Sequence, residues 1–392
     1  MGMTMQPLAH GQDAARTPLA RLEGITRARQ RMLVERAADA GSLIAPWIAR
    51  SWQRCLALGH APQQRVGFDP LPAAAMRRAR ERNRLLTQAA RGTLHSLGRA
   101  LADTRYFAIL TNADGVVVDV SGPIDRSDRR ADLITRVGVD LSEHCVGTTA
   151  IGAALTDLQP VWLHRGEHFF VDTSVYSCAG VPLFGPTGSC VGMLDLTGVE
   201  VAERPELLHL AQQSARSIEN AMTLQVAHAL LLRLNWPGHA LGGDTDALVA
   251  LDADGQVVAC NRAARDMVPQ LQHPAGVHLP PPHAGELFAL PFQMLFDAGA
   301  HGNTIDLPLW SGLHLQALAV PAGQSAMPTP AGLRMSAAPS AATGAGQRRL
   351  RDIETALIRR TVEETRGNVA EAAARLGVSR ATVYRRLGMR RA

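Results

Sequence analysis

Side chains that could contact a nucleic acid gather close to the C-terminus. Arginine guanidinium groups pair with phosphates and with guanine edges, and serine, threonine and tyrosine hydroxyls bond to phosphates and bases. Residues 348–392 carry 12 arginines against five acidic residues, a charge balance that favours phosphate binding. A solvated basic tail on a small helical bundle is the alternative interpretation. The candidate DNA contacts are Ser379, Arg380, Thr382, Tyr384, Arg385 and Arg386.

A second set of side chains, in the middle of the chain, could line a pocket for a small molecule. A few polar groups on an otherwise apolar wall are typical of such pockets. The alternative is that each of these residues caps or fills a core. The candidates are His144, Cys145, Thr148, Thr149, His168, Phe169, Tyr176 and Cys178.

The histidines and cysteines of this region do not predict a metal site. His164 and His168 are four residues apart, and two such imidazoles converge on one ion only when they lie on a helix. The surrounding pattern predicts loop and strand instead. We therefore expect no metal, no haem and no other cofactor. Redox sensing by Cys145 and Cys178 is a minor alternative.

The sequence carries no recognisable catalytic arrangement. All 40 basic residues are arginine, so neither a P-loop lysine nor a Schiff-base lysine is present. No serine–histidine–aspartate signature and no HExxH motif occurs. The prediction is a protein that is not an enzyme, and an enzyme is the alternative.

Three helices must position the C-terminal candidates. The spacing of apolar residues predicts helices over 352–365, 369–376 and 380–387, with Ala373 facing inward. Arg366-Gly367-Asn368 and Gly377 mark the turns between them. Two short helices joined by a tight turn form a helix-turn-helix, whose second helix enters the DNA major groove. Residues 348–392 are the expected DNA-binding domain.

Strands and short helices must position the pocket candidates. Asp114-Gly115 predicts a hairpin within 106–122, and further strands are expected at 161–163, 178–184 and 190–196. Gly147-Thr148-Thr149 opens a short helix. A long helix over 205–234 follows, as a coiled-coil seam or packed on its own sheet. Together these elements predict an α+β domain over 105–235.

The remaining segments flank that domain. Residues 1–104 are expected to be helical, with helices near 22–40, within 42–62 and over 73–102. Residues 236–243 are expected to be a linker. A strand, turn, strand and helix are expected over 246–268 and two final strands at 305–309 and 313–320, which makes 244–320 a separate module. Residues 321–347 are rich in alanine, proline and glycine and predict a flexible linker.

Composition limits where the protein works. Residues 1–105 carry 17 arginines and seven acidic residues, and residues 106–347 carry 11 and 23. No apolar run is long enough for a membrane span, and no signal peptide is apparent. Five widely spaced cysteines give no disulfide framework. The expected location is the cytoplasm.

The C-terminal segment resembles the DNA-binding domain of the factor-for-inversion-stimulation (Fis) family. The family pattern TRGNxxxAAxxLGxxRxTLxRxL stands here as TRGNVAEAAARLGVSRATVYRRL over 365–387, with Val383 in place of the usual leucine. The resemblance covers residues 350–389. It implies a homodimer, with the helix at 352–365 as the dimer contact.

The middle of the chain resembles the GAF sensor domain of bacterial regulators of the acetoin-catabolism type. The matching strings are GTTAIGAAL (147–155), PVW (160–162), EHFF (167–170), CAGVPLF (178–184) and GMLDLTG (192–198). Thr149 and Gly180-Val181 depart from the family pattern. Residues 42–62 resemble the opening of these regulators, and residues 246–268 resemble the start of a PAS domain. The resemblance implies a small-molecule effector.

Regulators of this type are usually sigma-54-dependent activators with a central ATPase domain. That domain needs GxxxxGK[ST] and a GAFTGA loop, and the sequence contains neither string. The expected fold is multidomain α+β: a GAF domain with an antiparallel sheet, a degenerate PAS-like module and an all-α helix-turn-helix. We predict a homodimeric regulator that binds double-stranded DNA and a small-molecule effector without ATPase activity, with RNA polymerase or a related activator as a further partner. The alternative is a non-enzymatic protein that co-assembles with or titrates a full-length sigma-54-dependent activator.

Overall fold

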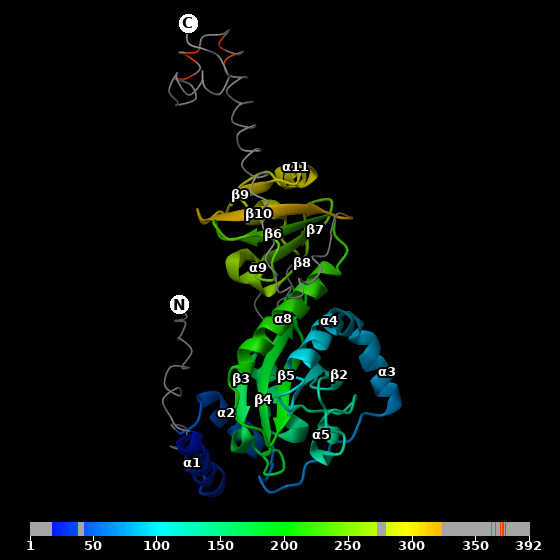
Figure 1. Cartoon of the computed structure of the whole chain (residues 1–392), viewed down its shortest axis with the longest axis vertical. Coiled ribbons are helices and arrows are strands. Elements are labelled where there is room, and N and C mark those ends of the chain that lie inside the picture. Colours follow the sequence, from blue (N-terminus) through cyan, green and yellow to red (C-terminus); the bar gives the residue numbers. More distant parts are fainter. Residues whose placement is uncertain are drawn as a thin grey trace, which may run out of the picture. The chain divides into compact units, whose positions relative to one another are not determined.

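The computed structural model describes residues 18–37, 43–272 and 280–323, together with Val362, Thr365, Val369, Glu371 and Ala373. The chain divides into two compact units, Met1–Met327 and Pro328–Ala392. The first unit contains two antiparallel five-stranded sheets, shown in Figure 1. A mixed fold of helices and antiparallel sheets was expected and is confirmed. None of the described helices is long and apolar enough to cross a bilayer.

The first sheet has the strand order β2-β1-β5-β4-β3, with every neighbouring pair antiparallel. Its strands are β1 (Tyr106–Asn112), β2 (Val117–Ser121), β3 (Val161–His164), β4 (Tyr176–Phe184) and β5 (Cys190–Val199). The strands expected from the sequence are therefore confirmed, including the hairpin at Asp114-Gly115.

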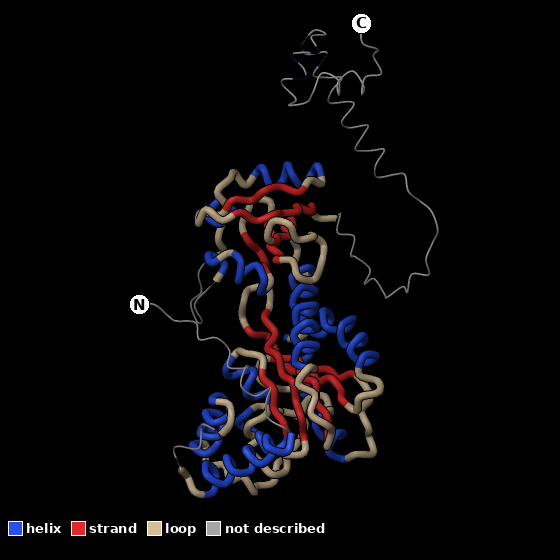
Figure 2. Tube along the Cα trace, turned by 60° about the vertical axis from the view of Figure 1, so that its left-hand side comes forward, coloured by secondary structure: helices blue, strands red, loops and turns tan. Residues whose placement is uncertain are grey.

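Alternating residues of these strands serve two different cores. On β5, Leu194 and Leu196 pack against α4 (Arg84–Ala100) and α8 (Leu207–Leu224). Met193, the residue before Leu194, packs on the other face with α5 (Arg129–Ile134) and α7 (Ala150–Asp157). The short helix α6 (Glu143–Val146) precedes α7. Figure 2 shows α4 and α8 together beside the strands. Helices thus cover both faces of the first sheet.

The N-terminal helices fasten the loop that follows β3. They are α1 (Pro18–Arg29), a π-helical segment (Gln30–Val34) and α2 (Pro46–Ala57). The Arg29 guanidinium donates to the carbonyls of Gly166 at 2.9 Å and Phe169 at 2.9 Å. The fully buried Trp52 donates its indole N–H to the Glu167 carbonyl at 2.9 Å. These contacts attach the N-terminal helices to the first sheet's loops.

The long helix expected over 73–102 is broken. The structure has α3 (Ala73–Arg82) and α4, separated at Asn83. The Asn83 side chain donates back to the Ala79 carbonyl at 2.6 Å, which closes the end of α3. The apolar spacing continues through the break, so periodicity alone did not reveal it.

The second sheet has the order β8-β7-β6-β10-β9. Its strands are β6 (Leu230–Asn235), β7 (Ala247–Leu251), β8 (Val257–Cys260), β9 (Thr304–Pro308) and β10 (His314–Pro321). The helical elements of this part of the chain are α9 (Arg262–Met267), a 3-10 turn (Pro269–Leu271), α10 (Ala284–Leu287) and α11 (Gln293–His301). Asn261 caps α9 by accepting from the Ala264 N–H at 2.9 Å. The expected strand-turn-strand-helix and the two final strands are confirmed.

Two expectations next to this sheet were wrong. The helix expected over 205–234 ends at Leu224, and residues 230–235 form β6, between β7 and β10. The expected linker at 236–243 is instead the connection between the paired strands β6 and β7. A short leucine-rich run is compatible with helix or buried strand, and here pairing on both edges selects the strand.

In the C-terminal unit, Val362, Val369, Glu371 and Ala373 are helical, and Thr365 lies in a turn. These positions fall inside the first two expected helices and at the end of the first. Ala373, expected to face inward, is buried. The third expected helix and all six candidate DNA contacts lie outside the described residues.

The two glycines at 192 and 92 predict opposite effects of the same substitution. A Cβ on Gly192 of β5 would lie 2.1 Å from the Thr111 carbonyl oxygen on β1, whereas a Cβ on Gly92 of α4 meets nothing within 4 Å. We expect Gly192→Ala to destabilise the protein by about 1–3 kcal/mol through overpacking. Gly92→Ala should stabilise it by about 0.5–1 kcal/mol through helix propensity. Urea unfolding measures both, and equal effects of the two changes would contradict the close strand contact.

Candidate functional site

A small cavity lies between the first sheet and the helices α5 to α7. Its volume is about 30 Å³, measured as the space open to the centre of a water molecule. That is room for roughly two waters, or for a ligand of a few heavy atoms. It is lined by Phe68, Ile109, Ile134, Leu141, Val146, Thr149, Ile151, His168, Thr173, Tyr176, Cys178, Asp195 and Thr197.

Four of the eight pocket candidates from the sequence line this cavity, and four do not. Thr149, His168, Tyr176 and Cys178 are in its wall. His144 and Cys145 lie on α6 and are exposed. Thr148 and Phe169 are buried, but against the N-terminal helices. Consecutive residues at the ends of short helices point in different directions, so sequence proximity did not decide which of them face the cavity.

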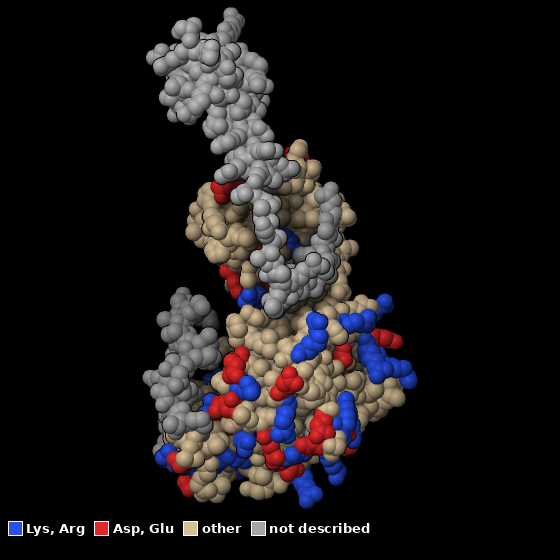
Figure 3. Space-filling view, viewed as in Figure 1, with Lys and Arg blue, Asp and Glu red and all other residues tan. Residues whose placement is uncertain are grey.

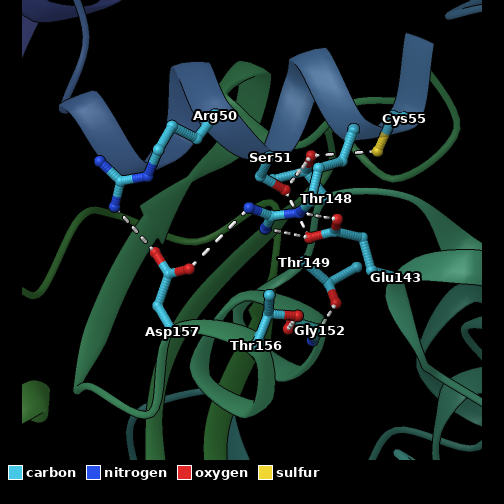
Figure 4. A network of polar contacts seen from close by, with 10 residues as sticks. Arg50, Ser51, Cys55, Glu143, Thr148, Thr149, Gly152, Thr156 and Asp157 are labelled. Atoms are coloured by element: carbon cyan, nitrogen blue, oxygen red, sulfur yellow. Dashed lines mark hydrogen bonds and ion pairs between the residues drawn. The ribbon is translucent and has the colours of Figure 1, made fainter. Parts of the chain in front are cut away.

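Thr148 belongs to a polar network that joins α2 to the start of α7, shown in Figure 4. Its hydroxyl lies 2.7 Å from the Ser51 hydroxyl, which donates to the Glu143 carboxylate at 2.6 Å. Arg54 pairs with the same carboxylate at 2.6 Å. The network holds the short helix α6 and the turn after it against α2. The next residue, Thr149, is thereby fixed at the cavity.

Thr149 is the N-cap of α7. Its hydroxyl oxygen accepts from the Gly152 N–H at 3.1 Å, a contact that satisfies one free donor of the helix. No acceptor for the hydroxyl proton is recorded among the described residues. Thr149 therefore faces the cavity with a hydrogen-bond donor available.

Strand β5 contributes two lining residues that sequence reasoning did not select. Asp195 and Thr197 are two positions apart, so they share the cavity face of the strand. Thr197 donates to one carboxylate oxygen of Asp195. The other, Oδ1, has no hydrogen-bond partner among the described residues, although Asp195 is only 1% exposed. A lone acidic residue inside the apolar string GMLDLTG was the signal that could have identified it.

Burial raises the pKa of Asp195 from the usual 3.8 to about 7, because the charged form loses its hydration. The hydrogen bonds with Thr197 and, to a smaller extent, with Cys178 act in the opposite direction but are weaker. A buried acceptor with no partner is costly, and such groups concentrate at functional sites. The cavity therefore presents one carboxylate oxygen, Oδ1, that has no hydrogen-bond partner among the described residues and can accept a hydrogen bond from a ligand.

The protonation of His168 follows from its surroundings. Its Nδ1 lies 2.9 Å from the Arg165 carbonyl, which can only accept, so Nδ1 carries the proton. Burial lowers the pKa of His168 to about 4, and the ring is neutral at neutral pH. Its Nε2 is then an acceptor, 3.6 Å from the Cys178 sulfur. Tyr176 donates its hydroxyl proton to the Arg130 carbonyl at 3.1 Å.

These groups suit binding better than catalysis or redox chemistry. Burial raises the pKa of the Cys178 thiol well above 9.0, so it is held as the unreactive thiol. No group of three potential metal ligands converges anywhere within the described ranges. What remains is a small cavity with an acceptor at Asp195 Oδ1 and a donor at Thr149, in a wall that is otherwise largely apolar.

The strand that carries Asp195 also leads to the second sheet. The hairpin between β4 and β5, residues 185–188, lies against α9. Arg265 donates to the Gly185 carbonyl at 3.2 Å, and the Cys260 N–H donates to the Pro186 carbonyl at 3.0 Å. On α8, Asn220 accepts from the Asn261 side chain at 2.7 Å. The cavity strand and the second sheet thus share direct polar contacts.

Comparison with known proteins matches both ends of the chain to families. Residues 349–388 match the model described as bacterial regulatory protein, Fis family, which confirms the Fis-type resemblance of the C-terminal segment. A bacterial regulatory protein is the class that this match defines. Residues 23–220, half of the chain, match the model of the MimR N-terminal domain. The chain belongs to this MimR N-terminal domain family.

Relatives with established names are transcription regulators. The chain is 32% identical over 269 residues to an acetoin catabolism regulatory protein of Cupriavidus necator, covering 61% of this chain and 39% of the relative. It is 31% identical over 259 residues to the propane 2-monooxygenase operon transcriptional activator MimR of Mycolicibacterium goodii, covering 61% and 42%. The chain thus spans about two-fifths of the length of these relatives.

Among solved structures, the complex of the N-terminal part of DhaR with DhaL from E. coli aligns with 71% of this chain and 100% of its own. The sequence identity is 15% and the TM-score 0.44. At that score the likeness does not establish a shared fold.

The buried carboxyl group predicts a pH-dependent stability. Because the native state holds the Asp195 proton more tightly than the unfolded chain, the contribution of Asp195 to stability is fully present below about pH 4 and is lost as pH rises through about 7. A shift of this size corresponds to about 4 kcal/mol. Asp195→Asn should remove this cost, so the variant should be more stable than the wild type at pH 8 and no more stable at pH 4. Denaturant unfolding at both pH values measures the difference.

Asp119→Asn is the matched control, because it removes a carboxylate from the half-exposed strand β2 outside the cavity. If Asp195→Asn destabilised the protein equally at both pH values, the buried Asp195 carboxyl group would not be the source of the pH dependence.

Proposed function

We propose that the protein is a transcription regulator whose C-terminal unit binds double-stranded DNA and whose first-sheet body, a GAF domain, binds a small-molecule effector. The Fis-family match supports DNA binding. The observation that carries the effector proposal is the buried Asp195 Oδ1, which has no hydrogen-bond partner in the part of the chain that the structure describes, on a residue that lines a cavity. The names of the relatives support a regulator rather than an enzyme.

The effector is a small, uncharged molecule with at least one hydroxyl group. Its hydroxyl donates to Asp195 Oδ1, and a second polar atom accepts from Thr149. An uncharged ligand is favoured because six lining residues are apolar and a cation would have to be desolvated to enter. The volume limits the ligand to a few heavy atoms unless the surrounding loops move apart.

The second sheet, proposed as a degenerate PAS-like module without a cofactor, receives the signal. Effector binding changes the position of β5, and the hairpin at 185–188 transmits that change to α9 through Arg265. The burial of the Glu219 carboxyl, which accepts from the Phe184 N–H at 2.8 Å, makes this connection stiff. Stiff polar contacts between two packed elements are a physical route for such coupling.

The assembly and its partners are proposed from the sequence. A homodimer formed through the helix at 352–365 would bind a site with two half-sites one helical turn apart. RNA polymerase, or a related sigma-54-dependent activator, would be the next partner. This chain would act without hydrolysing ATP, because its sequence contains no lysine for a phosphate-binding loop.

A thermal-shift screen tests the effector proposal. Small hydroxylated metabolites are added to the full chain, and a true effector at roughly 100 times its Kd should raise the Tm by about 5–10 °C. The shift should disappear in Asp195→Ala and persist in Asp119→Asn. A ligand that stabilises wild type and Asp195→Ala equally would show that the cavity carboxylate does not bind it.

Site selection from a random duplex pool, followed by binding measurements, tests the DNA proposal. We expect Arg380→Ala to lose about 1–3 kcal/mol of discrimination between the selected site and a scrambled duplex, since bidentate base contacts carry specificity. Arg348→Ala, which removes the same charge just outside residues 349–388, should keep that discrimination. Full site preference in Arg380→Ala would overturn the choice of reading helix. A chain that binds no duplex at low salt would favour the interaction-protein alternative.

A further inference from the structure

Helices α3 and α4 carry a dense group of exposed arginines that the proposed function does not use. Residues 73–100 contain seven arginines and one acidic residue, Glu81. Five of the arginines fall within eight consecutive residues, and we call their side chains the arginine surface: Arg77, Arg78, Arg80, Arg82 and Arg84. All five are exposed. Figure 3 shows basic side chains gathered over the edge of the body formed by these two helices.

The arginine surface has no partners within the described part of the chain, and no ion pair or side-chain hydrogen bond is recorded for any of its five residues. Other arginines of the same body are paired. Arg54 contacts Glu143 at 2.6 Å, Arg130 contacts Glu200 at 2.8 Å, and Arg136 contacts Asp132 at 2.6 Å. Five unpaired like charges on adjacent turns repel one another, which costs stability unless an anion binds.

The packing beneath the surface holds it in place. Leu86 and Ala89 of α4 are buried in the core of the first sheet. The chain entering α3 is tied to the loop after α5, since the Leu71 N–H donates to the Gly138 carbonyl at 2.8 Å. The arginines are therefore presented on fixed helices, which reduces the entropy lost when they bind.

The density of these charges is comparable to that of a nucleic-acid backbone. Residues 77 to 82 span about 8 Å of α3 at 1.5 Å per residue, and Arg84 is the first residue of α4. The same length of duplex DNA carries about four or five phosphates, one per 1.7 Å of axis. Arg78 and Arg82 are four residues apart and lie on one side of α3, and Arg77 and Arg80 lie on the neighbouring side. The two sides of α3 thus offer several closely spaced positive charges that can contact neighbouring phosphates on one side of a duplex.

We propose that the arginine surface binds the phosphate backbone of duplex DNA beside the site read by the C-terminal unit. The proposal depends on the proposed function, because it requires the chain to bind DNA. An acidic protein surface is the other conceivable partner. Protein interfaces have buried aromatic or apolar anchors, and the one exposed large hydrophobic residue recorded on α3 or α4 is Leu85. A surface of charge without anchors fits a phosphate backbone better.

The salt dependence of DNA binding tests this proposal. The full chain and a variant with Arg78→Ala and Arg82→Ala are titrated with a duplex that carries the selected site and extends several helical turns beyond it. Each lost phosphate contact lowers the slope of log K against log salt by about 0.9, so the slope should fall by about 2. The ratio between selected and scrambled duplexes of that length should stay the same, because phosphate contacts carry no sequence information.

Two controls separate this proposal from the others. A variant with Arg27→Ala and Arg65→Ala removes the same charge from two exposed arginines outside α3 and α4 and should keep the wild-type slope. On a duplex barely longer than the two half-sites, both variants should bind as the wild type does. Equal slopes for the two variants on the long duplex would contradict the proposal that the arginine surface binds the DNA backbone. Failure of the wild type to bind any duplex would instead overturn the proposed function.

Discussion

The pairing of β5 between β1 and β4 is the constraint on which the rest of the first body depends. Seven residues of β5 pair with β1, and β4 pairs along nearly the full length of the other edge. A strand fixed on both edges cannot change its register without moving every side chain to the opposite face. Leu194 and Leu196 are therefore committed to the core under α4 and α8. For the same reason, the side chains of Asp195 and Thr197 must face the cavity. A strand that was free to shift its register would move the Asp195 carboxyl group out of this buried position.

The N-terminal helices complete the cavity by fixing its loops. The Glu167 carboxylate is buried, and it accepts from the backbone of His164 at 2.7 Å while pairing with Arg21 at 3.0 Å. Burial nevertheless raises the pKa of Glu167 to about 7, so desolvation outweighs the pairing. Such an arrangement adds little net stability but sets the position of the next residue, His168. The N-terminal helices thus contribute to the cavity by fixing the backbone next to His168, which lines it.

The contacts between the two sheets have the same character. The Phe184 N–H at the end of β4 donates to the Glu219 carboxylate of α8, and Arg265 of α9 donates to the Gly185 carbonyl. Asn261 donates to Asn220 of α8, and the Arg262 guanidinium lies 5.2 Å from the centre of the Phe184 ring. Directional contacts of this kind are sensitive to small displacements, whereas apolar packing tolerates sliding. The hairpin at 185–188 is consequently the segment through which a displacement of β5 would reach the second sheet.

Much of the fold could be predicted, because local rules govern turns, caps and most strands. Asp114-Gly115 and Asp254-Gly255 place their hairpins without help from the rest of the chain, since the glycine adopts a positive φ that other residues avoid. Asn261 caps its helix through a bond three residues away. The Fis-type motif at the C-terminus is a local pattern too, which is why it was visible in the sequence alone.

Only the tertiary structure decided those secondary-structure elements and side-chain orientations that depend on residues far away in the sequence. Residues 230–235 are leucine-rich and compatible with helix, and it was pairing with β7 and β10 that made them a strand. Thr148 and Thr149 are adjacent and chemically alike, yet one bonds to α2 and the other faces the cavity. The role proposed for Asp195 depends on its burial and on an oxygen, Oδ1, that has no partner among the described residues, and both are properties of the folded surroundings. The sequence determined where the chain turns and which residues could do chemistry, because those depend on near neighbours. The fold determined which of them meet, because that depends on packing between segments far apart in the chain.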